Sequence, residues 1–120
     1  MGHHDRLRRI ERSGAPTALH VEVAATFKQR LIGLLNAPPL PPDRGLWIHP
    51  CGRVHTVGMR WPIDVVMLDP QGTILSLQEN LSPWRLGPAG HRAGAALELA
   101  AGGIRKYALT LGDQLTLGDP

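Results

Sequence analysis

Apolar and polar residues alternate along several short stretches of this chain, which is the pattern of half-buried β-strands. In residues 18–24 (ALHVEVA), Leu19, Val21 and Val23 alternate with polar residues, so one face should be buried and the other solvated. Residues 45–49 (GLWIH) put Leu46 and Ile48 on one face of a strand and Trp47 with His49 on the other. Both stretches are predicted to be strands.

A run that is apolar on both faces predicts a strand in the middle of a sheet. Residues 63–69 (IDVVMLD) form such a run, and 69–72 (DPQG) has Asp, Pro and Gly where a type I turn prefers them. A hairpin to residues 73–79 should follow. Further strands are predicted at 95–100 and 112–118, with a turn or short helix at 101–109.

One longer segment has helical spacing instead. Thr26 and Gln29 match a capping box, and the following apolar residues recur every three to four positions. Asn36 and the prolines after it end the predicted helix. The expected fold is mainly β, a small β-sandwich or barrel with one N-terminal α-helix.

The length, composition and charge of the chain indicate how many domains it forms and where they begin. With 120 residues, 42% hydrophobic and 19% charged, the chain suits one folded domain. Arg6, Arg8, Arg9 and Arg12, four of the thirteen basic residues, lie in the first twelve. We therefore expect a flexible basic arm over 1–17 and a single β-rich domain over 18–120. Because the rest of the chain is close to neutral, we expect no nucleic-acid binding. We also expect a monomer.

The cysteine count and the apolar runs bear on location. The one cysteine, Cys51, excludes an intramolecular disulfide, which fits a reducing compartment. No apolar run reaches the roughly 20 residues of a membrane span. We expect a cytoplasmic protein if Met1 is the natural start, and a periplasmic or exported one if a signal has been removed.

Residues 49–69 (HPCGRVHTVGMRWPIDVVMLD) concentrate the candidate chemistry. Cys51 is a candidate nucleophile with His55 or His49 as its base, which would make a thiol-dependent hydrolase or transferase. The alternative is a thiol that packs beside a strand end, the commonest fate of an unbonded cysteine. We favour the second interpretation.

A metal site is a further alternative. His49, Cys51 and His55 carry ligands that zinc accepts, and Asp64 or His91 would supply a fourth. The spacing matches no standard structural zinc site, so we predict no metal. The glycines match neither phosphate-binding nor dinucleotide-binding motifs, so we predict no cofactor.

Asp64 stands out because it falls within an apolar strand. A carboxylate there must be paired or hydrogen-bonded. Arg60, His55 and Arg85 are candidate partners, as is a hydrogen bond from Thr56 or the backbone. A structural role is favoured over a catalytic one.

Two loops place an arginine beside a tryptophan in a proline-containing segment, at 59–62 (MRWP) and 82–88 (SPWRLGP). Tryptophan and arginine on rigid loops are typical of sites for small anions, sugars or peptides. Alternatively, both tryptophans plug the core. If the strands close, both loops should lie at one end, with His91 and Arg92 at the rim.

The motifs TFKQRLIGLL, GLWIHPCGRVHTVGMRWPIDVVMLD, PWRLGP, ALELAAG and GDQL, in that order, resemble the domain of unknown function 192 family, over about Ala18 to Leu117. The resemblance implies a compact, mainly β domain with a helix near its start and no established activity. It also implies that Met59, Pro62 and Asp64 are the features shared most widely, because another branch lacks Cys51 and His55.

The sequence thus favours a non-catalytic binding or interaction module for a small ligand or a protein segment. Its site is expected near residues 50–64. The alternatives are a cysteine-dependent enzyme (Cys51, His55, Asp64) and a metal-binding domain (His49, Cys51, His55). The predicted ligand-binding residues are His55, Met59, Arg60, Trp61, Asp64, Trp84 and Arg85.

Overall fold

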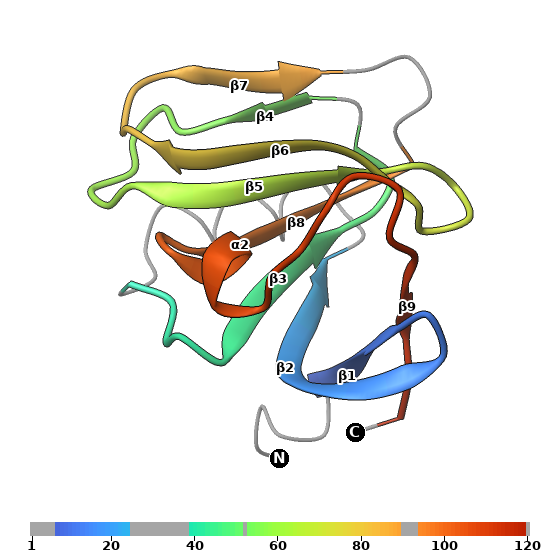
Figure 1. Ribbon diagram of the computed structural model, residues 1–120. Helices are drawn as coiled ribbons and strands as arrows, with labels where there is room; N and C mark the ends of the chain where they lie inside the picture. Colours follow the sequence, from blue (N-terminus) through green and yellow to red (C-terminus); the bar gives the residue numbers. More distant parts are fainter. Residues whose placement is uncertain (1–6, 25–38, 52, 90–93, 120) are drawn as a thin grey trace.

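The computed structural model describes residues 7–24, 39–51, 53–89 and 94–119 (Figure 1). Its elements are β1 (Leu7–Arg12), β2 (Ala15–Ala24), β3 (Arg44–Ile48), β4 (Arg53–His55), β5 (Ile63–Leu68), β6 (Ile74–Leu81), β7 (Leu86–Ala89), β8 (Ala95–Ala100), α2 (Gly103–Lys106) and β9 (Leu115–Leu117). Seven strands form one sheet, in the order β6-β5-β8-β3-β2-β1-β9, and β4 pairs with β7 in a second. The predicted mainly β, single-domain fold is confirmed.

The predicted central strand is β5. All six of its residues are buried, and it pairs antiparallel with β6 on one side and β8 on the other. The turn that follows has the expected chemistry, because Asp69 accepts the backbone N–H of Gly72 through its carbonyl and those of Gln71 and Thr73 through its carboxylate. The hairpin prediction is therefore also confirmed.

The period of two correctly predicted the faces of β2 and β3. Leu19 and Val21 are buried, and Trp47 lies on the face opposite Leu46 and Ile48. Val23 continues the apolar face of β2 but stays 41% exposed, because it lies where the strand reaches the end of the sheet.

The seven-stranded sheet curls until its two edge regions meet. The backbone N–H of Ile74, at the start of β6, donates to the carbonyl of Asp113 (2.8 Å), and that of Leu115 in β9 donates to Gly72 (2.8 Å). These bonds join the first and last strands of the sheet order and make the domain barrel-like.

The two faces of the curled sheet bury separate hydrophobic cores. The core inside the curl comprises Ile10, Leu19, Val21, Trp47, Val66, Leu68, Ile74, Ala95, Leu97, Leu99, Ile104, Leu109 and Leu115. The core on the other face, beneath the ribbon formed by β4 and β7 (Figure 1), comprises Ala24, Leu46, Ile48, Cys51, Val54, Met59, Ile63, Val65, Met67, Leu81 and Ala96. The ribbon thus covers the core on the outer face of the sheet.

The prediction of a flexible arm over residues 1–17 is wrong for residues 7–17. β1 pairs with both β2 and β9, and Ile10 between them is 1% exposed. Arg8 donates to the carbonyls of Leu117 and Gly118, and Arg12 donates to those of Tyr107 and Ala108 and pairs with Asp113. The basic residues of β1 therefore fasten the C-terminal segment to the sheet.

The segments 50–64 and 81–94, predicted as a turn and a loop, also contain strands. β4 and β7 pair antiparallel over Arg53↔Ala89 and His55↔Leu86. The approach is close: a Cβ on Gly87 would lie 3.0 Å from the carbonyl oxygen of Val54. A side chain there would be tightly crowded, so the residue that suggests a loop favours the close pairing.

The predicted helix at 26–36 lies outside the described residues. Within the described ranges, no helix is both long and apolar enough to cross a membrane.

Candidate functional site

Thr56 joins the two loops that carry the arginines and tryptophans. It follows β4 and is fully buried. Its backbone N–H donates to the carbonyl of Arg85 (2.8 Å), and its carbonyl accepts the N–H of Trp84 (2.9 Å). Its hydroxyl donates to the carbonyl of Ser82 (2.6 Å) and accepts the N–H of Arg85 (2.9 Å). Four hydrogen bonds from one residue thus fix residues 82–85 against residues 56–62, so the expectation that both loops lie at one end is confirmed.

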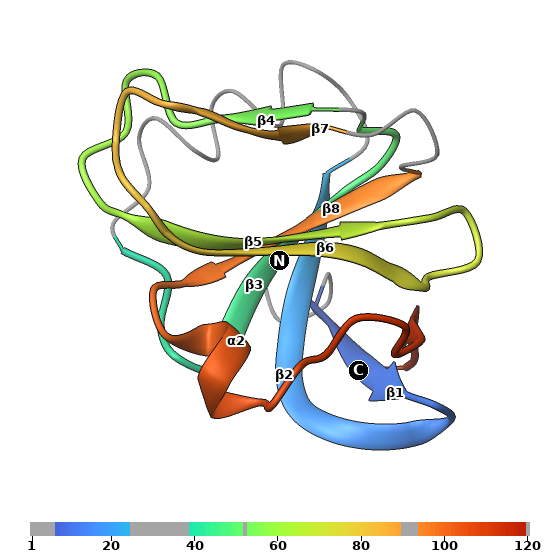
Figure 2. The same ribbon diagram turned by 45° about the horizontal axis from the view of Figure 1, so that its top comes forward.

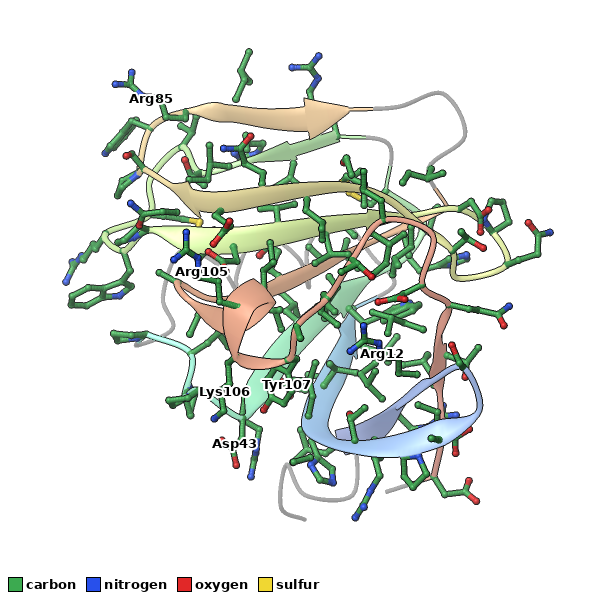
Figure 3. All side chains as sticks on the ribbon, in the orientation of Figure 1. Arg12, Asp43, Arg85, Arg105, Lys106 and Tyr107 are labelled. Atoms are coloured by element: carbon green, nitrogen blue, oxygen red, sulfur yellow. The ribbon has the colours of Figure 1, made fainter. Side chains whose placement is uncertain are left out.

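The loops present an apolar and basic surface, here called the tryptophan end, made of Val57, Arg60, Trp61, Trp84, Arg85 and Leu86. Its apolar members are exposed by 44% (Val57), 42% (Trp61), 66% (Trp84) and 69% (Leu86). The two loops run side by side in both views (Figures 1 and 2), and Arg85 points away from the sheet (Figure 3). The interpretation of Trp61 and Trp84 as core plugs is therefore wrong.

Trp84 has an unusual backbone. Its φ of 63° lies in the left-handed region, which costs a bulky residue about 1 kcal/mol. The hydrogen bonds of Trp84 and Arg85 to Thr56 hold this conformation. The fold therefore keeps a strained residue with most of its side chain in solvent, a combination associated with functional surfaces.

His55 and Met59 support this surface from beneath. Nδ1 of the half-buried His55 accepts the backbone N–H of Val57 (3.3 Å), and Met59 is 7% exposed within the outer core. Both shape the loop, although they were predicted as ligand-binding residues. His91 and Arg92, proposed for the rim, lie outside the described residues.

Cys51 has the environment of a packing residue. It is 5% exposed, belongs to the core beneath the ribbon, and its thiol donates to the carbonyl of Arg53 (3.2 Å). The thiol of Cys51 thus has a backbone partner in Arg53, and Nδ1 of His55 has one in Val57.

Alkylation of Cys51 by iodoacetamide is expected to be slow in the folded protein. The thiol becomes exposed only when the ribbon opens locally. If this opening costs on the order of 3 kcal/mol, the folded protein should react roughly a hundredfold more slowly than the denatured chain. The rate should be measured from pH 6 to 10, with guanidinium-denatured protein as control. Fast reaction of the folded protein with a midpoint well below pH 8.5 would revive the enzyme hypothesis.

The three candidate metal ligands do not come together. Among the described residues, no group of three or more His, Cys, Asp or Glu side chains is arranged to hold a metal ion. His49 is exposed at the end of β3, whereas Cys51 is buried.

Asp64 is a structural carboxylate. It is fully buried, and its Oδ1 accepts the backbone N–H of Asn80 (2.9 Å), while its Oδ2 accepts those of Gly102 (3.1 Å) and Ile104 (2.9 Å). The backbone hydrogen bonds proposed from sequence are confirmed, whereas the side-chain partners proposed beside them, namely Arg60, His55, Arg85 and Thr56, are wrong. The carboxylate ties the end of β6 and the start of α2 to β5.

Glu98 is a buried carboxylate that sequence analysis overlooked. It is fully buried in β8, flanked by Leu46 and Val65 on the neighbouring strands, and neither carboxylate oxygen has a hydrogen-bond partner within the described residues. Burial raises the pKa of Glu98 to about 8. Its burial could have been predicted from the sequence, because Glu98 alternates with Ala96 and Ala100 on one face of an otherwise apolar strand.

Thr56 was also underestimated, as one of several partners for Asp64. It comes two residues after the apolar Val54 and continues the buried face of β4 just beyond the end of that strand, which could have indicated burial.

These features define a small, curled β-sheet domain topped by a two-stranded ribbon, with a rigid tryptophan- and arginine-bearing surface at one end. The chain belongs to the DUF192 family (uncharacterized ACR), whose model matches residues 8–117. This confirms the resemblance found in the sequence.

Solved structures share the fold. A protein from Sinorhizobium meliloti, described as a candidate transcription regulator, is 26% identical, with a TM-score of 0.77 over 92% of this chain and 93% of that chain. A protein of unknown function from Novosphingobium aromaticivorans is 18% identical, with a TM-score of 0.76 over 92% and 84%. No curated protein gave a significant match.

Proposed function

We propose that this protein is a non-catalytic binding module that uses the tryptophan end to bind a segment of a partner protein. The observation that carries the proposal is the pair of exposed tryptophans on two loops held together by one buried threonine. Tryptophan and arginine contribute most often to binding energy at interfaces, and rigid loops lose little conformational freedom on binding.

The surface indicates the chemistry of the partner. Four large apolar side chains at least two-fifths exposed form an apolar area of the kind that marks interaction sites. Arg60 and Arg85 are exposed at the same end. A segment with aromatic or aliphatic residues beside Asp or Glu complements this surface, through apolar burial and through charge-assisted hydrogen bonds to the guanidinium groups.

A protein segment suits the surface better than a nucleic acid does. Arg8 donates to backbone carbonyls, and Arg12 donates to carbonyls and pairs with Asp113, so fewer of their N–H groups are left to contact phosphates. The regulator description of the Sinorhizobium protein is therefore not extended to this chain.

A selection from a random peptide display library tests the proposal. Peptides recovered on the wild-type protein should combine apolar and acidic residues. Trp84→Ala should weaken them at least tenfold, measured by fluorescence anisotropy, because a central tryptophan contributes about 2 kcal/mol or more. Arg85→Ala should weaken them several-fold and reduce the salt dependence.

Leu111→Ala is the matched control. Leu111 is 66% exposed, like Trp84, but lies outside the tryptophan end, so its removal should change the affinity less than about twofold. Recovery of no peptides, or equal binding by the Trp61→Ala, Trp84→Ala and wild-type proteins, would refute the proposal.

A further inference from the structure

The end of the domain away from the tryptophan end contains a pocket of about 380 Å³. Its lining comes from the ends of β2 and β3, the turn between β5 and β6, the start of β8, and β9. It is lined by Val23, Trp47, His49, Asp69, Pro70, Gln71, Gly72, Ala95, Leu115, Thr116 and Leu117. Trp47, Ala95 and Leu115 also belong to the core inside the curl, so the pocket is the mouth of the barrel-like sheet.

The incomplete burial of Val23 has its explanation here. Val23 lies beside Trp47 in the register of β2 and β3 and continues the inward face of β2, yet it remains 41% exposed. It faces the mouth, where the inward alternation of the strand continues beyond the packed interior.

The opposite wall of the mouth is rigid. The turn at 69–72 is fixed to β9 by the hydrogen bond from the N–H of Leu115 to Gly72 (2.8 Å), and the side-chain amide of Gln114 donates to the carbonyl of Gln71 (2.9 Å). A Cβ on Gly72 would lie 2.0 Å from the carbonyl oxygen of Leu115. A wall held in this way does not collapse into the pocket.

The lining indicates an uncharged ligand with a hydrogen-bond acceptor. The carboxylate of Asp69 is engaged by the N–H groups of Gln71 and Thr73. The indole of Trp47 and the imidazole of the exposed His49 also line the pocket, and both rings carry N–H groups that can donate hydrogen bonds. The valine, leucine, alanine and proline side chains supply apolar walls.

The volume of the pocket limits the size of the ligand. Small-molecule sites usually occupy about 300–1,000 Å³, and an apolar cavity of about 150 Å³ is large enough for benzene. A pocket of about 380 Å³ therefore has room for a molecule of two fused rings.

We propose that this mouth is a second binding site, specific for an uncharged, mainly apolar molecule of one or two rings that carries one hydrogen-bond-accepting group. The site is independent of the tryptophan end, and each can exist without the other.

Titration with 2-naphthol, an uncharged two-ring probe, tests the inference. In ¹H–¹⁵N spectra, the indole signal of Trp47 should shift saturably, with a dissociation constant below about 1 mM, an affinity within reach of a ligand of this size. The indole signals of Trp61 and Trp84 should not shift. Naphthalene-2-sulfonate, of the same shape but charged, should bind at least tenfold more weakly.

Two valine variants distinguish the sites. Val23→Phe fills the mouth and should weaken 2-naphthol at least tenfold, whereas Val57→Phe, at a valine of nearly equal exposure in the tryptophan end (44% against 41%), should leave it unchanged. Both substitutions are at exposed positions, and unchanged melting temperatures would confirm folding. An unshifted Trp47 signal, equal binding by the Val23→Phe protein, or equal binding of the sulfonate would overturn this inference without affecting the proposed function.

Discussion

Replacing Asp64 by alanine is expected to lower the free energy of unfolding by about 3 to 5 kcal/mol. The substitution leaves the backbone N–H groups of Asn80, Gly102 and Ile104 without their acceptor, and a buried donor that loses a charged partner costs about 1 to 3 kcal/mol. Urea denaturation followed by circular dichroism measures the change.

Two further variants separate this explanation from a general effect of losing a carboxylate. Asp64→Asn keeps one oxygen acceptor, so it can retain the Gly102 and Ile104 bonds and should cost about half as much as alanine. Asp69→Ala removes an acceptor of two N–H groups in a more exposed turn and should cost only about 1 kcal/mol. An Asp64→Ala protein as stable as the Asp69→Ala protein would contradict the structural role of Asp64.

Raising the pH from 5 to 8 is expected to reduce stability by on the order of 3 kcal/mol through Glu98. Burial raises the pKa of this carboxyl group from 4.5 to about 8, so the folded protein keeps the proton up to about pH 8 while the unfolded chain releases it above about pH 4.5. The folded state therefore binds more protons between these two values, and stability decreases as the pH rises through that window.

Glu98→Gln isolates this contribution, because it keeps the shape and removes the charge. The variant should be more stable than wild type at pH 8, and the difference should vanish near pH 5. Asp113, whose pKa is lowered mainly by its hydrogen bond from the backbone of Thr110, acts below the window. Parallel stability curves for the two proteins would exclude a perturbed Glu98.

The sequence predicted those parts of the fold that depend on local alternation. β2, β3, β5, β6, β8 and β9 were all expected, because each strand buries one or both faces and shows it within a few residues. β1 was missed because Ile10 is surrounded by charged side chains, and their role became visible only when β9 was placed beside them. β4 and β7 were missed because such short strands carry little pattern, and because β7 includes a glycine, Gly87, at its close approach to β4.

The adjacency of the two tryptophan-bearing loops was predicted from the sequence, whereas the individual contacts beneath them were not. Trp61, Trp84 and Arg85 were identified from residue type, since those side chains are informative wherever they are exposed. The partners of Asp64 are backbone groups at residues 80, 102 and 104. The sequence does not show which backbone N–H groups will lie beside a given side chain, so only the folded structure could identify these three donors.

The seam between β1 and β9 has a consequence for how the chain folds. The hydrogen bond from Arg8 to Gly118 spans 110 positions, and the curl is completed only when these two strands meet. Contacts so distant along the chain require a large loop to close first, which slows folding. Any chain that has not yet acquired β9 leaves one edge of β1 unpaired, and such an edge is a template for pairing with other molecules. The arginines of β1 place positive charge along that edge, so they reduce aggregation during folding as well as fastening the C-terminal segment afterwards.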